Sequence, residues 1–166
     1  MAKKRGQLSL SFGMIFSIIL IVVFISFAFF AIKKFLDIQK SIEVGKFLND
    51  FQSDVDRMWQ GSQGSEAKAY SIPKKIEYLC FADYAESAIG NSSVLYQRLY
   101  EVYYENENMF FYPVGSGEGL DSKELKHIDI KRITQAENPF CIKNNQGKLN
   151  IVIKKDFGEA LVTISE

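Results

Sequence analysis

The sequence predicts an α+β fold in which a long N-terminal helix precedes a small, antiparallel β-rich head domain. An uncharged apolar run lies near the N-terminus, an amphipathic helical period follows it, and short segments rich in β-branched and aromatic residues fill the rest. We therefore divide the chain into a basic leader (1–7), a transmembrane helix (8–32), an amphipathic extension (33–60), a linker (61–72) and a β-rich domain (73–166).

The formal net charge of zero conceals two unlike regions. Lys+Arg and Asp+Glu number 20 each, but residues 1–36 hold five basic residues and no acidic one. Residues 37–166 therefore hold 15 basic and 20 acidic residues. Together with the apolar run, this distribution excludes a soluble single-domain enzyme. It also excludes a nucleic-acid binder with a broad basic face, so no nucleic acid is expected as a partner.

The apolar run is long enough to cross a membrane. Phe12 to Ile32 is 21 residues without a charge, and a helix of that length spans a hydrocarbon core of roughly 30 Å. A cleavable secretory signal would have a shorter apolar region and a small-x-small site. The apolar run in this chain is longer than that and continues to Lys33 and Lys34. The sequence therefore predicts a retained span in the lipid bilayer.

The orientation follows from the flanking charges. Lys3, Lys4 and Arg5 precede the span, whereas two lysines follow it, so the positive-inside rule favours a cytoplasmic N-terminus in the cell membrane. Both cysteines lie beyond the span, as does the one N-x-S/T sequon, which begins at Asn91 and marks it as a candidate glycosylation site. We expect a single-pass protein with an extracytoplasmic C-terminal domain.

The helical period continues beyond the span. Phe35, Ile38 and Ile42 recur at steps of three and four, and no proline precedes Pro73, so the helix is expected to include residues 33–60. This stripe has two compatible explanations: it packs on the chain's own C-terminal domain, or it also packs against copies of itself. The apolar residues that continue the stripe are Leu48, Phe51, Val55 and Met58.

The head begins after a glycine- and serine-rich hinge within the linker, at residues 61–65. Three strands are expected before the last third of the domain, and Ser93 is expected to cap a short helix between the first two. These strands cover residues 75–81, 109–112 and 127–130.

The strongest β signal lies at the C-terminus. Residues 140–143 and 149–153 flank a glycine-containing turn, which predicts a hairpin. A further turn leads to residues 160–164. We therefore expect a three-strand meander.

The available chemistry is sparse. In an exported domain, Cys80 and Cys141 would form a disulfide from the first strand to the meander, whereas in a reducing compartment they would be buried thiols. His127, the only histidine, is expected to be an ordinary half-exposed side chain. The sequence has no C-x-x-C pair and no recognised catalytic motif. We therefore expect neither an enzyme nor a bound metal or cofactor.

The order of parts resembles archaeal type IV pilin-like proteins with the class III type of signal, in which Q-x-S-x-E follows the cleavage point. Gln7 and Ser9 match this motif, whereas Ser11 stands where the motif has glutamate. The resemblance implies that a prepilin peptidase cuts between Gly6 and Gln7, and that the apolar helices then bundle into a filament core.

Two functions follow as expectations. The first is a pilin-like or pseudopilin-like structural subunit, anchored in the membrane and able to associate with itself through the N-terminal helix. The alternative is a bitopic membrane protein whose ectodomain binds or scaffolds a partner. All eight tyrosines lie beyond the span, which slightly favours an interaction surface on the head.

Overall fold

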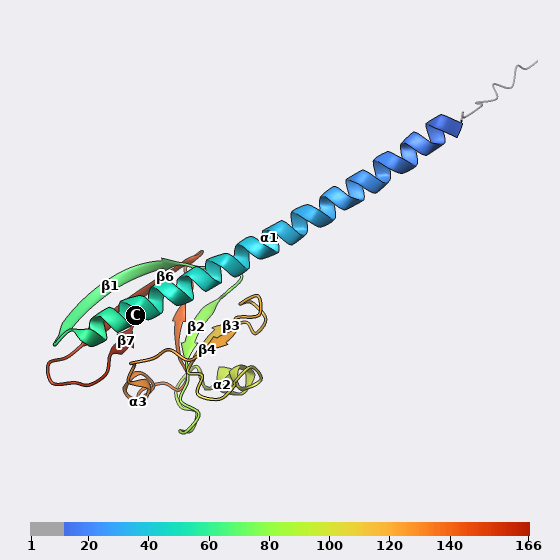
Figure 1. The fold of residues 1–166 in the computed structure, drawn as a ribbon. Helices are drawn as coiled ribbons and strands as arrows, with labels where there is room; N and C mark the ends of the chain where they lie inside the picture. Colours follow the sequence, from blue (N-terminus) through green and yellow to red (C-terminus); the bar gives the residue numbers. More distant parts are fainter. Residues whose placement is uncertain (1–11) are drawn as a thin grey trace, which may run out of the picture. The chain divides into compact units, whose positions relative to one another are not determined.

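The computed structural model describes residues 12–166 (Figure 1). The predicted leader and the processing residues Gly6, Gln7 and Ser9 therefore lie outside the described residues. The chain divides into two compact units between Ile38 and Gln39. The helix α1 (Phe12–Gln60) contributes to both units. This long N-terminal helix, followed by antiparallel strands, confirms the predicted α+β class.

The first unit, as far as it is described, is the N-terminal part of α1. Its two serine side chains are satisfied within the helix, because the hydroxyls of Ser17 and Ser26 donate to the carbonyls of Gly13 and Val22, each at 2.8 Å. This part of α1 is a candidate membrane span by length and composition. The arrangement of such a helix before a β domain is compatible with a single-pass membrane protein.

In the second unit, the C-terminal part of α1 packs on the head. One stripe of the helix is buried there, and aromatic rings from the head contact Phe47 and Phe51. The prediction that the extension packs on its own domain is therefore confirmed for its C-terminal part. The buried residues of α1 are Val44, Phe47, Leu48, Phe51 and Val55.

A three-stranded antiparallel sheet has the order β1 (Gly64–Ser71), β6 (Lys148–Lys155) and β7 (Thr163–Ser165). The linker predicted over 61–72 is therefore wrong for most of its length. Residues 64–69 are small or charged, so they lack the apolar alternation that identifies a strand in sequence. β1 forms nevertheless, because β6 pairs with it along its whole length.

A four-stranded antiparallel sheet has the order β4 (Ser122–Lys123), β3 (Met109–Tyr112), β2 (Tyr78–Phe81) and β5 (Phe140–Lys143). The strand predicted at 109–112 is confirmed, and β2 occupies the second half of the strand predicted at 75–81. β5 pairs with β2 at its full length.

The hairpin predicted between residues 140–143 and 149–153 is wrong, because β5 and β6 belong to different sheets. Asn144 explains the separation. Its backbone N–H donates to the carbonyl of Glu77, and its side chain donates to the carbonyls of Pro73 and Ile76. These bonds hold the end of β5 beside the segment before β2. The last pair of the predicted meander is confirmed, since β6 pairs with β7.

Two short helices complete the head. In α2 (Ser93–Tyr100), Ser93 is the first helical residue and not the cap, which is Ser92. The strand predicted at 127–130 is wrong, because His127 has a φ of 64° and α3 (Ile130–Ile133) begins within that segment. The side chain of Asp129 accepts a bond from the N–H of Arg132 and caps α3, a role that alternation alone does not reveal.

Candidate interaction site

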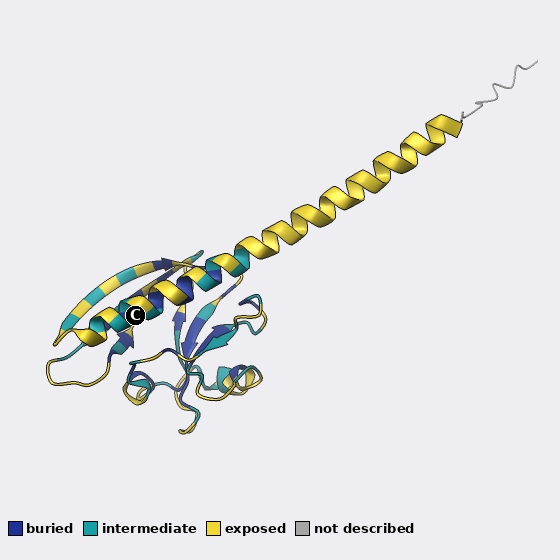
Figure 2. Cartoon of the chain, in the orientation of Figure 1, coloured by how far each residue is buried: buried dark blue, intermediate teal, exposed yellow. Residues whose placement is uncertain are grey.

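The largest candidate interaction site is the apolar surface of α1 from Phe12 to Ile42, which we call the anchor surface. Every residue from Phe12 to Gln39 is exposed, and Ile42 remains 64% exposed although it belongs to the second unit. Figure 2 shows this change along α1, from exposed residues to a buried stripe. The first half of the predicted amphipathic stripe is therefore exposed, at Phe35, Ile38 and Ile42.

An apolar surface of this extent points to a partner. Soluble monomers expose apolar residues singly, whereas contiguous apolar surfaces mark membrane or protein contacts. The exposed side chains between Phe12 and Ile32 lie all around the helix, as a lipid-facing segment requires. The anchor surface is thus the part of the described chain that fits a bilayer or other apolar helices.

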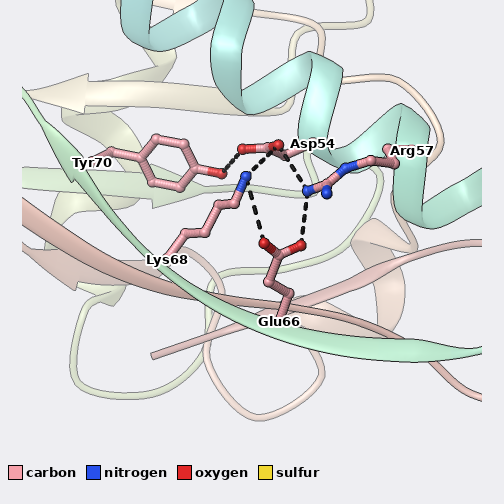
Figure 3. A network of polar contacts seen from close by, with 5 residues as sticks. All are labelled: Asp54, Arg57, Glu66, Lys68 and Tyr70. Atoms are coloured by element: carbon pink, nitrogen blue, oxygen red, sulfur yellow. Dashed lines mark hydrogen bonds and ion pairs between the residues drawn. The ribbon is translucent and has the colours of Figure 1, made fainter.

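A polar network ties the C-terminal part of α1 to β1 (Figure 3). Asp54 accepts from the ammonium of Lys68 at 2.6 Å and from the hydroxyl of Tyr70 at 2.6 Å. Arg57 donates to Asp54 at 3.0 Å and to Glu66 at 2.7 Å. Because the charged side chains of β1 point inward to α1, they also oppose pairing of this edge strand with another chain.

The network shifts the pKa values of the two residues at its centre, Asp54 and Tyr70. Burial opposes ionisation of Asp54, but the hydrogen bonds from Lys68 and Tyr70 and the nearby positive charges outweigh it, so the pKa of this carboxyl lies below its ordinary value. Burial, followed by the bond to the Asp54 carboxylate, raises the pKa of Tyr70. Asp54 is therefore held ionised and Tyr70 protonated, which suits a structural contact between helix and strand.

The only histidine lies in a contact that the sequence did not reveal. The rings of His127 and Trp59 stack with centroids 3.8 Å apart and an interplanar angle of 5°. Nδ1 of His127 lies 2.9 Å from a carboxylate oxygen of Asp56, and the indole N–H of Trp59 donates to the carbonyl of Ala160. The side chain of His127 is half-buried, as predicted, but it connects the end of α1 to the segment before α3.

Cys80 and Cys141 form a disulfide. The two residues lie directly opposite each other on β2 and β5, so the bond joins neighbouring strands across 61 positions of sequence. The predicted pairing is confirmed. Its second strand belongs to the four-stranded sheet and not to a C-terminal meander.

Three tyrosines gather around Tyr84 on one side of the four-stranded sheet. Its ring contacts those of Tyr96, Tyr100 and Tyr103 with centroids 4.6–5.2 Å apart, and also that of Phe110. Burial and these neighbouring phenols raise the pKa of Tyr84. Tyr100 and Tyr104 remain 55% and 75% exposed. The cluster therefore exposes Tyr100 at the end of α2, although much of it serves as a local core, and Tyr104 is a separate exposed aromatic side chain.

The other predicted positions are placed as follows. Asn91 is exposed in the turn before α2. Within residues 12–166, no three histidine, cysteine, aspartate or glutamate side chains are arranged to hold a metal ion.

Comparisons with protein-family models, with curated proteins and with solved structures gave no match.

Proposed function

We propose that this protein is a membrane-anchored structural subunit of the pilin-like or pseudopilin-like kind. It crosses the cell membrane once, keeps its N-terminus in the cytoplasm and carries its head on the extracytoplasmic side. The leader is cut between Gly6 and Gln7, and the retained helix anchors the subunit and packs against copies of itself.

The observation that carries this proposal is the contrast within α1. Five apolar residues between Val44 and Val55 are buried, whereas every residue from Phe12 to Gln39 is exposed. A subunit that is first held in lipid and then bundled with other helices needs an uncovered apolar surface of this kind. The Cys80–Cys141 disulfide supports an oxidising compartment for the head.

The N-terminal sequence supports the same proposal. Gln7 and Ser9 occupy the motif positions of class III signals, whereas Ser11 replaces the glutamate of the motif. In such families the glutamate is thought to assist docking of a subunit in the membrane. With serine at this position, association of this chain depends more on apolar packing, for which the stripe of Phe35, Ile38 and Ile42 is suited.

The mass of the protein extracted from membranes tests the proposal. A chain that begins at Gln7, together with sheared filaments that contain it, would support the proposal, and a Gly6→Val variant is expected to keep the leader. A mature chain that begins at residue 1 or 2 would contradict it.

The orientation has its own test. The number of reactive thiols should rise from zero without reductant to two with reductant, whereas accessible free thiols would argue against an exported head.

The alternative is a bitopic membrane protein whose head binds or scaffolds a partner. Two exposed aromatic side chains favour it, Tyr100 at the end of α2 and Tyr104 after it. This alternative predicts an uncut leader and a stable heterologous partner after crosslinking in membranes. Replacement of Tyr104 by alanine should then weaken the crosslink, whereas a filament subunit would still assemble.

A further inference from the structure

We propose that the side chain of Asn91 carries an N-linked oligosaccharide, which covers exposed apolar residues next to α2. The inference rests on the proposed export of the head, because the acceptor must face the compartment in which the sugar is transferred. Asn91-Ser92-Ser93 has the acceptor pattern, with serine and not proline between the asparagine and the second serine. None of the other seven asparagines has serine or threonine two positions later.

The structure leaves the acceptor side chain accessible. Asn91 is exposed, and within the described part of the chain its carboxamide makes no hydrogen bond. Only its backbone N–H is used, as a donor to the carboxylate of Glu137 at 3.3 Å. A sugar attached to the side-chain nitrogen would therefore displace no contact of the folded head.

Backbone hydrogen bonds hold the segment before Asn91, whereas the helix after it lacks a side-chain cap. Before it, Ile89 exchanges two backbone hydrogen bonds with Asn138, each at 3.0 Å. After it, α2 has only eight residues, and its N-cap Ser92 makes no side-chain bond to the helix. The first turn, which includes the second serine of the sequon, is tied to Glu137 by the backbone N–H of the acceptor and the hydroxyl of Ser92. Because it lacks a side-chain cap, opening it to present the sequon to a transferase costs less than opening a capped turn.

The surface next to the acceptor gives the sugar a role. Ile89 and Val94, two and three residues from Asn91, are 44% and 75% exposed. Each is an exposed branched aliphatic side chain close in sequence to the acceptor, and exposed apolar surface favours non-specific association. A bulky, hydrated glycan on Asn91 would shield both residues.

Transfer of the oligosaccharide to Asn91 is a substitution at the anomeric carbon and involves no oxidation or reduction. The donor is an oligosaccharide whose anomeric carbon is joined to the phosphate of a membrane lipid. The carboxamide nitrogen of Asn91 attacks that carbon as the carbon–oxygen bond to phosphate breaks. The nitrogen gives one proton to a base of the transferase, and the lipid phosphate leaves with the electron pair of the broken bond.

The experiment uses the full chain extracted from the membranes of its own cells. After reduction and alkylation, trypsin releases residues 76–98 as one peptide, since Lys75 and Arg98 flank a segment without other basic residues. Mass spectrometry is expected to find hexose- or hexosamine-type mass on Asn91. The added mass should be lost in Asn91→Gln and Ser93→Ala. It should persist in Ser92→Ala, which keeps the acceptor pattern, and in Asn145→Gln, which alters an exposed asparagine outside a sequon.

The disulfide state separates the two proposals, and it is read from a portion of the same extract in which free thiols are blocked before reduction. If Cys80 and Cys141 are bonded and the peptide carries no sugar, the glycosylation proposal is wrong and the export of the head stands. If both thiols are free and the peptide is bare, both proposals fail. Sugar that persists in Asn91→Gln would place the modification elsewhere and overturn the assignment to Asn91.

Discussion

Residues 12–39 and residues 40–60 belong to one helix but bury their side chains differently. The first segment is more apolar, yet all of it is exposed, whereas the second carries many charges and buries five apolar residues in the head. The difference follows from the arrangement of apolar side chains. In the second segment they form one stripe that a single domain can cover, whereas in the first they surround the helix. Under the proposed function, the more apolar part of α1 is the part that contacts lipid or other copies.

The largest expected effect is the loss of stability when a phenylalanine of the buried segment is replaced by alanine, compared with the same replacement in the exposed segment. Phe51 is fully buried and its ring contacts those of Phe47, Tyr70 and Phe81. Phe51→Ala should therefore lower the free energy of unfolding of the head by about 3–5 kcal/mol. Phe35→Ala, at an exposed position of α1, should leave it unchanged within about 0.5 kcal/mol. Chemical denaturation in detergent measures both, and a comparable loss in Phe35→Ala would show that the head also covers the first segment.

The next effect concerns the disulfide, which lies wholly within the head. Replacement of both Cys80 and Cys141 by alanine should lower the free energy of unfolding by about 2–4 kcal/mol, because the unfolded chain regains the freedom of a long closed loop. Retention of the protein in membranes should not change. The same denaturation series and membrane fractionation check these outcomes, and unaltered stability would mean that packing alone holds β2 beside β5.

A smaller effect is expected in the contact between α1 and β1. Tyr70→Phe removes the donor to Asp54 but keeps the ring among Phe47 and Phe51, so the loss should be about 1.5–3 kcal/mol, as for hydrogen bonds to charged groups. Tyr104→Phe is the matched control, because this tyrosine is 75% exposed. An equal loss of stability in the two variants would contradict a stabilising hydrogen bond from Tyr70 to Asp54.

The smallest effects are expected from pH. Tyr70 and Tyr84 have raised pKa values in the folded head, so their contribution is complete below the ordinary tyrosine pKa of about 10 and is lost as pH rises above it. Asp54 has a lowered pKa, so its contribution is present above about pH 4 and is lost as pH falls further. Thermal unfolding at a series of pH values checks both limits, and Tyr70→Phe should weaken the alkaline loss. A profile that stays flat above pH 10 would contradict the buried tyrosines.

The sequence predicted those features whose signals are local. The apolar run, the stripe through Phe51 and the strand at 109–112 can each be recognised from the residues of the segment itself. The disulfide between Cys80 and Cys141 was predicted from the expectation that an exported domain lies in an oxidising compartment. β1 could not be predicted, because its inward side chains are Glu66, Lys68 and Tyr70, whose partners lie on α1.

Long-range contacts explain the other differences. The turn after β5 looks like a hairpin turn, but the bonds from Asn144 to the segment before β2 assign β5 to the other sheet. The cap formed by Asp129 replaces a strand by α3. The contact of His127 with Trp59 and Asp56 joins segments about 70 residues apart in sequence, a distance at which no spacing rule applies.

The most direct test of the account asks what surrounds each segment of α1 in the membrane. Nitroxide labels on Val22→Cys and Ser53→Cys would be compared in native membranes, where the bonded Cys80 and Cys141 do not react. We predict that the label at position 22 collides mainly with dissolved oxygen, which concentrates in lipid, and that the label at position 53 collides mainly with a water-soluble nickel complex. Equal access of the nickel complex to both positions would contradict an anchored helix.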